Sequence, residues 1–137
     1  MSQIEKVVVL GAGSWGTALS IVLDEKGHDC LIWSHREDQS IEINQKNTNQ
    51  RYLPGLALPK TLHATSSLKE AALHGQIIVM AVPTKGIREV CQNILAHLTE
   101  PVLFVHVSKG IEPDSLKRIS EMIKEEIKMR MDAGVFD

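Results

Sequence analysis

The chain has 137 residues, of which 43% are hydrophobic and 23% are charged, a length and composition that suit one globular domain with a substantial core. Its formal net charge of -2 offers no electrostatic attraction for nucleic acid or for an acidic membrane surface. No apolar run is long enough for a membrane span and residues 1–5 do not resemble a signal peptide, so we expect a cytoplasmic protein.

An apolar strand followed by a glycine-rich turn opens the chain. The run from Val7 to Leu10 predicts a strand buried on both faces, as in a parallel sheet. It leads directly into Gly11, Gly13 and Gly16, which have the spacing G-x-G-x-x-G. In a dinucleotide-binding turn these glycines make the tight turn, let the backbone approach a pyrophosphate, and let the next helix pack closely on the sheet. Because a strand precedes the motif, and a helix and a second strand follow it, a dinucleotide site is favoured over a purely structural glycine turn.

The first predicted helix runs from about Ser14 to Lys26 and ends at Gly27, a residue type common after a helix C-terminus. Its first turn offers unpaired N–H groups and the positive end of the helix dipole, which together bind phosphate. Ser14 and Trp15 lie in that turn and are candidates for contact with a cofactor. For Trp15 two interpretations stay open, packing in the core or forming a wall of the cofactor groove.

The end of the second predicted strand, Cys30 to Trp33, is where a fold of this kind selects its dinucleotide. An acidic residue here accepts from the ribose 2′-hydroxyl of NAD, whereas a basic residue suits the 2′-phosphate of NADP. No acidic residue ends this strand, and Glu37 falls just past the expected position. Arg36 can pair with a 2′-phosphate through its planar guanidinium, with His35 assisting or lying near the adenine. The pattern predicts a preference for NADPH over NADH, while solvated turn residues remain the alternative for both side chains.

The rest of the chain continues the alternation of strands and helices. Further helices are predicted at about 41–46, 67–75 and 85–98 and from Pro113 to about 127, and further strands at 61–65, 77–82 and 101–107. We expect Tyr52 and Leu53 to attach the loop over 47–60 to the body, and a functional role is the alternative for them. The last helix is expected to have Glu112 and Asp114 at its start and a buried stripe of Leu116, Ile119, Ile123 and Ile127. The pattern predicts an α/β fold of the Rossmann type, a doubly wound, mainly parallel sheet with helices on both faces.

Two further loops are expected to border the cofactor, because ligands of open parallel sheets gather at the carboxyl ends of the strands. The first is the segment 82–85, in which Pro83 stops the strand ladder. The second carries Lys109, a cation beside a glycine, which can touch both a cofactor and an anionic substrate. A solvated surface lysine stays an equal alternative from position alone.

The cysteine and histidine residues show no metal-binding pattern. Cys30 and Cys91 lie far apart within apolar runs, which predicts reduced, buried thiols. The six His residues lack metal-ligand spacing, so no metal site is expected.

Several motifs in order resemble the amino-terminal domain of the bacterial-type NAD(P)-dependent glycerol-3-phosphate dehydrogenases. The resemblance covers about residues 4–127 and is carried by LGAGSWGTALS from Leu10, WSHR from Trp33, YLPG from Tyr52, AVPTKGIREV from Ala81 and FVHVSKGIEPDSLKRISE from Phe104. It implies an NADPH site, with NAD as a second cofactor, that is lined by Ser14, Trp15, His35 and Arg36. It also implies that Lys109 contacts both NADPH and glycerol 3-phosphate.

The reaction that this resemblance implies is hydride transfer between the nicotinamide and C2 of dihydroxyacetone phosphate, which gives sn-glycerol 3-phosphate for phospholipid synthesis. The family's general-acid lysine is expected in a second, helical domain that would follow the NAD(P)-binding domain at residues 1–127. Residues 128–137 match no family pattern, and the family's Gly-Pro-Ser substrate segment is missing. We therefore expect a truncated chain, a natural fragment or an altered reading frame, with no catalytic residue of its own, weak NADPH binding and very little turnover. The surface meant for the second domain would stay bare and favour association, a homodimer being one form.

Three other functions remain open at this stage. Another dehydrogenase, of the 2-hydroxyacid or 6-phosphogluconate type, shares the nucleotide domain, but the SKGIEP segment argues against it. A non-catalytic NADPH-binding module is favoured by the missing general acid. A methyltransferase ranks last, because those enzymes usually end the second strand with an acidic residue.

Overall fold

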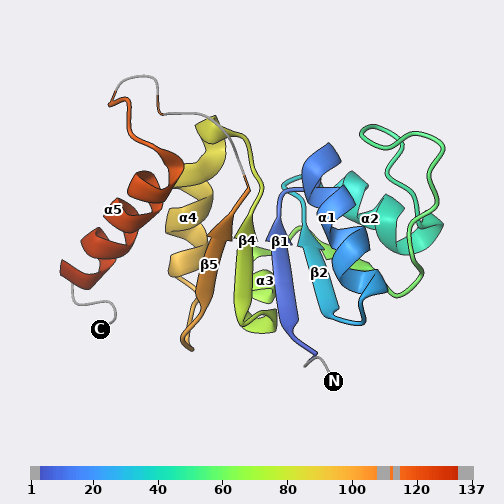
Figure 1. Cartoon of the computed structure of the whole chain (residues 1–137), viewed down its shortest axis with the longest axis horizontal. Coiled ribbons are helices and arrows are strands. Elements are labelled where there is room, and N and C mark those ends of the chain that lie inside the picture. The colour runs from blue at the N-terminus through green and yellow to red at the C-terminus, as the bar shows by residue number, and fades with distance from the viewer. Residues whose placement is uncertain (1–3, 108–111, 113–114, 133–137) are drawn as a thin grey trace.

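The computed structural model describes residues 4–107, 112 and 115–132, and it shows one sheet of five parallel strands in the order β3-β2-β1-β4-β5 (Figure 1). The strands are β1 (Lys6–Leu10), β2 (Asp29–Trp33), β3 (His63–Thr65), β4 (Ile77–Met80) and β5 (Leu103–His106). The helices are α1 (Ser14–Glu25), α2 (Glu37–Lys46), α3 (Leu68–His74), α4 (Ile87–Leu95) and α5 (Ile119–Asp132), with the 3-10 turn η1 (Thr84–Gly86) before α4. The predicted Rossmann-type arrangement is confirmed.

The first strand lies at the centre of the sheet, where both of its faces are covered. Val8, Val9 and Leu10 are fully buried, as the continuous apolar run predicts. Leu10 lies opposite Trp33 of β2 and opposite Met80 of β4 in the parallel register. The carboxyl ends of β1, β2 and β4 therefore meet at one edge, and the loops that leave them are neighbours.

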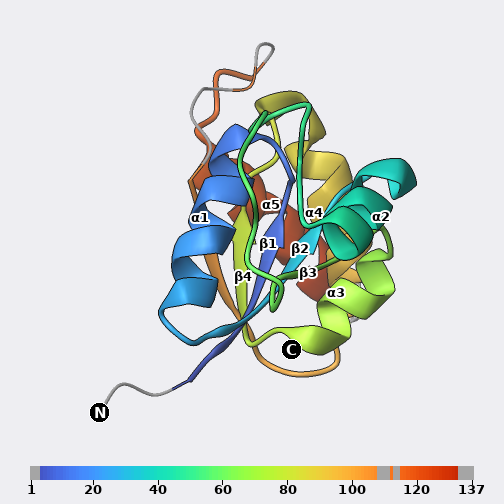
Figure 2. The ribbon, with the colours of Figure 1, turned by 90° about the vertical axis from the view of Figure 1, so that its right-hand side faces the viewer.

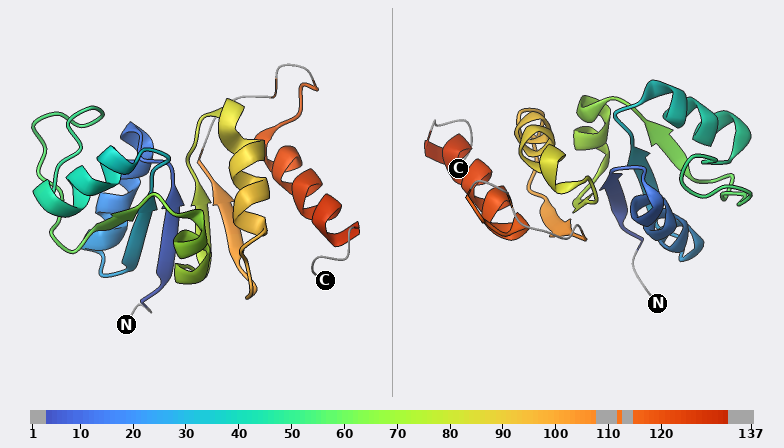
Figure 3. Two further views of the ribbon diagram at one scale, coloured as in Figure 1. Left: turned by 180° about the vertical axis from the view of Figure 1, so that it is seen from behind. Right: turned by 90° about the horizontal axis from the view of Figure 1, so that it is seen from above.

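Two hydrophobic layers sandwich the sheet. On one face, Val7, Val9 and Ile32 pack with the apolar side of α1 and with Ile43 of α2. On the other face, Val8 and the neighbouring strands pack against α3, α4 and α5. Figures 2 and 3 show α1 and α3 on opposite sides of the strands, which is the doubly wound arrangement.

Helix α2 begins earlier than predicted, at Glu37 instead of Ile41. Glu37 and Asp38 occupy its first turn, where carboxylates are stabilised by the positive end of the helix dipole. Helix α3 is capped by Ser67, whose hydroxyl accepts from the backbone N–H of Glu70.

The last helix begins at Ile119, later than predicted from Pro113, a residue outside the described part of the chain. The predicted place of Leu116 in its buried stripe is wrong, because Leu116 is 66% exposed and has a φ of 58°. Ile119 and Ile123 are buried as predicted. The helix continues to Asp132, beyond the predicted boundary at residue 127.

Strand β5 is less well covered than the other strands. Its side chains Leu103 and Val105 are exposed. Figure 1 shows that, on the face of the sheet that α1 covers, none of the described helices lies over β5. This sheet face carries apolar residues that the described chain leaves in contact with solvent.

Candidate cofactor site

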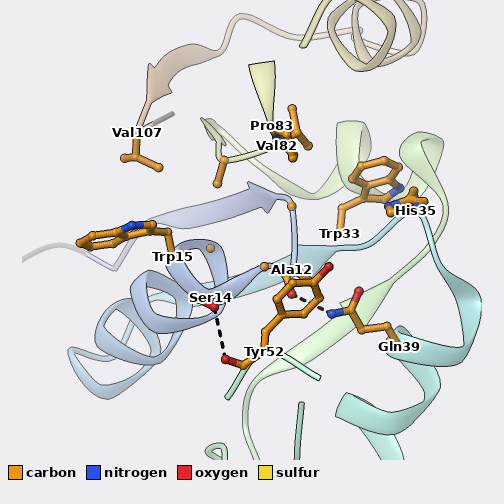
Figure 4. Close-up of a pocket in the computed structure, with 14 residues that line it drawn as sticks. Ala12, Ser14, Trp15, Trp33, His35, Gln39, Tyr52, Val82, Pro83 and Val107 are labelled. Atoms are coloured by element: carbon orange, nitrogen blue, oxygen red, sulfur yellow. Dashed lines mark hydrogen bonds between the residues drawn. The ribbon is translucent and has the colours of Figure 1, made fainter. Parts of the chain in front are cut away.

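A cavity of about 500 Å³ opens at the carboxyl edge of the sheet, between the glycine turn and the segments that follow β2, β4 and β5 (Figure 4). A volume of this size is typical of a small-molecule site. The residues that line it are Gly11, Ala12, Gly13, Ser14, Trp15, Gly16, Trp33, His35, Gln39, Tyr52, Ala81, Val82, Pro83 and Val107. The structure thus brings His35 and Pro83, from later parts of the chain, beside the glycine turn that carries the three glycines, Ser14 and Trp15.

Two of the three glycines are required by the packing of the turn itself. Gly11 has a φ of 123°, and a Cβ atom there would lie 2.7 Å from the carbonyl oxygen of Ala81. A Cβ on Gly16 would lie 1.9 Å from the carbonyl oxygen of Gly11. These contacts explain the tight turn and the close approach of α1 to the sheet.

Gly13 differs from the other two, because a Cβ added to it would meet nothing within 4 Å. The packing of the chain therefore gives no reason for a glycine at this position. The open space beside its backbone lies at the cavity, where a pyrophosphate would need the room. The predicted role of Gly13 in cofactor approach remains a prediction that this geometry supports.

Helix α1 points its N-terminus at the cavity without a side-chain cap. Gly13 occupies the N-cap position, and the first helical hydrogen bond runs from Thr17 N to Gly13 O at 3.0 Å. The first N–H groups of a helix have no acceptor within the helix. No acidic side chain lies in this first turn, so nothing there repels an anion.

The exposure of the Trp15 indole excludes one of its two interpretations. Trp15 is 75% exposed and lines the cavity, so core packing is wrong, and its role as a wall of the cofactor groove remains a prediction. Across the cavity mouth, the Ser14 hydroxyl donates to the carbonyl oxygen of Tyr52 at 3.2 Å (Figure 4). This bond ties the loop at 47–60 to the start of α1.

The end of β2 presents two aromatic rings to the cavity. The rings of Trp33 and His35 are inclined at 47° with centroids 6.5 Å apart. Trp33 is buried, and its indole Nε1 has no hydrogen-bond partner among the described residues. His35 is exposed at the rim, where an adenine ring could lie against it.

Arg36 lies next to His35 in the chain but is not among the residues that line the cavity. Its guanidinium is paired with Asp38, with Nε 3.2 Å from Oδ1 and Nη2 3.0 Å from Oδ2. This pairing lowers the pKa of Asp38. A 2′-phosphate would have to displace or share this carboxylate, and the contact predicted for Arg36 remains a prediction.

The segments after β4 and β5 complete the cavity wall. Pro83 and Val82 contribute from the first segment, as predicted, and Val107 contributes from the second. Lys109 follows two residues later and lies outside the described residues, so its predicted contact with cofactor and substrate remains a prediction.

Two polar residues at the site were not predicted. Gln39 lines the cavity, together with Tyr52 of the 47–60 loop, and Asn49 is fully buried behind it. Asn49 falls in a polar loop sequence, NTNQ, whose composition predicts exposure. Only the tertiary contact with the glycine turn distinguishes it from its neighbours.

The thiols lie away from the cavity. Cys30 and Cys91 are free and buried, as predicted, and burial raises their pKa values to about 11 and about 12. Among residues 4–107, 112 and 115–132, no group of three His, Cys, Asp or Glu side chains could hold a metal ion. Within the same ranges, no helix is both long enough and apolar enough to cross a membrane.

A nicotinamide dinucleotide fits the groups that the cavity offers. The bare helix N-terminus and the open backbone at Gly13 suit a pyrophosphate, and the aromatic rim at His35 suits an adenine.

Comparison with known proteins identifies relatives over nearly the whole chain. The family described as NAD-dependent glycerol-3-phosphate dehydrogenase N-terminus matches residues 6–136. Glycerol-3-phosphate dehydrogenase [NAD(P)+] of Lysinibacillus sphaericus is 63% identical over 90% of this chain, and the Bacillus mycoides protein of the same name is 52% identical over 89%. The chain spans only 37% and 36% of the lengths of these two relatives.

A solved structure agrees with the sequence relatives. The crystal structure of glycerol-3-phosphate dehydrogenase from Coxiella burnetii superposes with a TM-score of 0.83 at 31% identity. The match covers 90% of this chain and 38% of that one.

Proposed function

Since this chain belongs to the family of NAD-dependent glycerol-3-phosphate dehydrogenase N-terminal domains, we propose that it is the cofactor-binding part of an oxidoreductase that interconverts dihydroxyacetone phosphate and sn-glycerol 3-phosphate. The sn-glycerol 3-phosphate formed in this reaction would serve phospholipid synthesis. The observation that carries the proposal is the bare N-terminus of α1, which faces the cavity beside a glycine that the packing does not require.

The bound nicotinamide would supply the hydride chemistry, and the chain would supply binding and orientation. The turn at Gly13 and the first N–H groups of α1 would hold the pyrophosphate. Trp15 and Pro83 would form walls of the groove, and His35 would lie against the adenosine. Lys109 would contact the cofactor and the anionic substrate. None of these side chains is assigned as the general acid. By resemblance, the general acid is a different lysine, which belongs to a second domain.

We further propose that the site prefers NADPH to NADH through Arg36. Its guanidinium offers a planar pair of donors, which is the geometry that it already uses toward Asp38. An Arg36→Ala change should weaken NADPH about tenfold and leave NADH unchanged, because only NADPH carries the 2′-phosphate. Arg118→Ala is the matched control, since Arg118 is an exposed arginine that pairs with Glu121 and does not line the cavity.

Calorimetric titration of the 137-residue chain with NADPH and NADH tests the binding proposal. We expect both to bind, NADPH more tightly, and we expect very little oxidation of NADPH when dihydroxyacetone phosphate is added. Failure to bind either dinucleotide would contradict the cofactor assignment. Turnover at a rate typical of an enzyme would contradict the assignment of the general acid to another domain, and equal affinities would remove the role of Arg36.

We also propose a cytoplasmic protein that associates through its uncovered sheet face. The free, buried thiols of Cys30 and Cys91 suit a reducing compartment. Leu103 and Val105 expose apolar surface beside the outer edge of β5, and such edges promote pairing between chains. Sedimentation at rising concentration should show a dimer, and a clean monomer would contradict the association.

A further inference from the structure

The backbone carbonyl of Ala12, in the middle of the glycine turn, accepts hydrogen bonds from two buried side-chain amides. Gln39 donates from Nε2 at 2.7 Å, the bond drawn in Figure 4, and Asn49 donates from Nδ2 at 3.0 Å. Gln39 is 7% exposed and Asn49 is 0% exposed. The two donors come from α2 and from the loop at 47–60, so two separate parts of the chain converge on one carbonyl group.

The orientation of both amides follows from their other partners. The second hydrogen of Gln39 Nε2 goes to Asn49 Oδ1 at 3.1 Å, and the second hydrogen of Asn49 Nδ2 goes to Thr17 Oγ1 at 2.9 Å. Because a carbonyl oxygen can only accept, the atoms that face Ala12 must be the amide nitrogens. Both amide groups therefore use all their donors, and neither can rotate without leaving a buried group unpaired.

The same network reaches the end of β2. The Ser34 hydroxyl donates to Gln39 Oε1 at 2.5 Å, and its oxygen accepts from the backbone N–H of Arg36 at 3.1 Å. The glycine turn and the start of α2 are thus held in one arrangement before any ligand arrives.

A planar trans peptide places its C=O and its N–H on opposite sides. The carbonyl of Ala12 faces the two amides, so the N–H of Gly13, in the same peptide unit, points away from them. Gly13 lines the cavity and has open space beside it. A glycine is the residue whose flanking peptide rotates most easily, so this orientation needs an external restraint.

We propose that Gln39 and Asn49 are positioning residues that hold the Ala12–Gly13 peptide with its N–H toward the pyrophosphate of the dinucleotide. The inference rests on the proposed function, because the pyrophosphate belongs to the cofactor assigned there. Its distinctive consequence is that NADPH and NADH are affected equally, since both carry the pyrophosphate. Adenosine 2′-monophosphate, which lacks it, is unaffected.

The test uses Asn49→Leu and, separately, Gln39→Met in the 137-residue chain. Each change removes one donor to Ala12, and we expect each to weaken NADPH and NADH by the same factor of about five to ten. Binding of adenosine 2′-monophosphate, followed by NMR titration, should stay within twofold of the unchanged chain. Asn44→Leu is the matched control: Asn44 lies on α2 and makes two hydrogen bonds to the backbone of Ala64, at 2.8 Å each, away from the cavity.

The outcomes separate this inference from the proposed function. If the unchanged chain binds neither dinucleotide, both are overturned. If it binds them but the two variants match it, or Asn44→Leu weakens binding as much as they do, the positioning role alone is overturned. If neither variant folds, the amide resonance of Gly13 in the unchanged chain decides: a large shift on adding either dinucleotide supports the role, and an unmoved resonance overturns it.

Discussion

The two ends of the sheet are held together by different forces. On the side of α1 and α2, the glycine turn is held by neutral amides and hydroxyls that are buried and fully paired. On the side of α4 and α5, the connection depends on charge. Arg88 lies 2.5 Å and 2.8 Å from the two carboxylate oxygens of Glu112, 3.0 Å from Glu126 and 3.1 Å from Glu125.

The difference shows which requirement each end meets. Neutral hydrogen bonds change little with salt or with pH near neutrality, which suits a site that must present the same backbone groups at all times. The Arg88 cluster instead joins α4, α5 and Glu112 through one guanidinium and three carboxylates, and one of these, Glu125, also pairs with Lys117. Its strength depends on protonation and on its burial.

The largest expected effect separates packing from binding within the glycine turn. Gly16→Ala should destabilise the fold by about 4 kcal/mol or more, because the new Cβ would lie 1.9 Å from the Gly11 carbonyl oxygen. Gly13→Ala should leave thermal stability nearly unchanged, since its Cβ meets nothing within 4 Å, but it should weaken NADPH binding. Thermal melting and calorimetry measure the two effects, and similar melting temperatures for both variants would contradict the distinction.

The second prediction concerns the charged end. Arg88→Met should destabilise the fold by about 3 kcal/mol, because it leaves Glu126, which is only 3% exposed, without its cation. The matched control is Arg118→Met, which breaks an exposed pair with Glu121 and should change stability by less than about 1 kcal/mol. Urea unfolding measures both, and equal losses would show that burial of the cluster contributes nothing.

A third, smaller effect depends on pH. Hydrogen bonds from Arg88 and Ser115 lower the pKa of Glu112 from its ordinary value of 4.5 to about 2. A carboxyl group whose pKa is lowered by folding stabilises the fold above its unfolded pKa, and this contribution is lost as the pH falls toward its folded pKa. The unchanged chain should therefore lose stability between about pH 5 and pH 2, and Glu112→Gln should lose less over that window.

Urea unfolding of the unchanged chain and of Glu112→Gln, followed by circular dichroism at about pH 5 and at about pH 2, gives this comparison. Parallel stability curves for the two chains would mean that Glu112 titrates alike in the folded and unfolded states.

The smallest expected effect returns to the cofactor side. Asp38→Asn frees the guanidinium of Arg36 and should tighten NADPH about twofold, because an exposed ion pair contributes little. NADH should not change, and in an Arg36→Ala background the substitution should have no effect on either dinucleotide. Tighter binding of NADH as well would show that Asp38 acts through general charge and not through Arg36.

Sequence patterns predicted the sheet and the position of the cavity well. The apolar run at Val7 and the glycine spacing depend on local geometry, and the parallel register then places the loops after β1, β2 and β4 at one edge. Boundaries were harder to predict because tertiary contacts decide them. Leu116 has a φ of 58°, which is outside the helical region, and the backbone N–H of Glu112 donates to Lys117 O, so the last described helix begins only at Ile119.

Side-chain partners were the least predictable feature. Asn49 and Gln39 are polar residues in polar segments, and their burial follows only from the approach of the glycine turn. The pairing of Arg36 with Asp38 was not predicted either, because the sequence argument used only the position of Arg36 after a strand.

Both tryptophans of the chain border the cavity, one largely open to solvent and the other enclosed. The intrinsic emission should therefore contain a red-shifted component from Trp15 and a blue-shifted component from Trp33. Reduced nicotinamide absorbs light in the region where indoles emit, so an occupied groove should quench both components by energy transfer. Tryptophan fluorescence should therefore report whether a reduced dinucleotide occupies the cavity, without an added label.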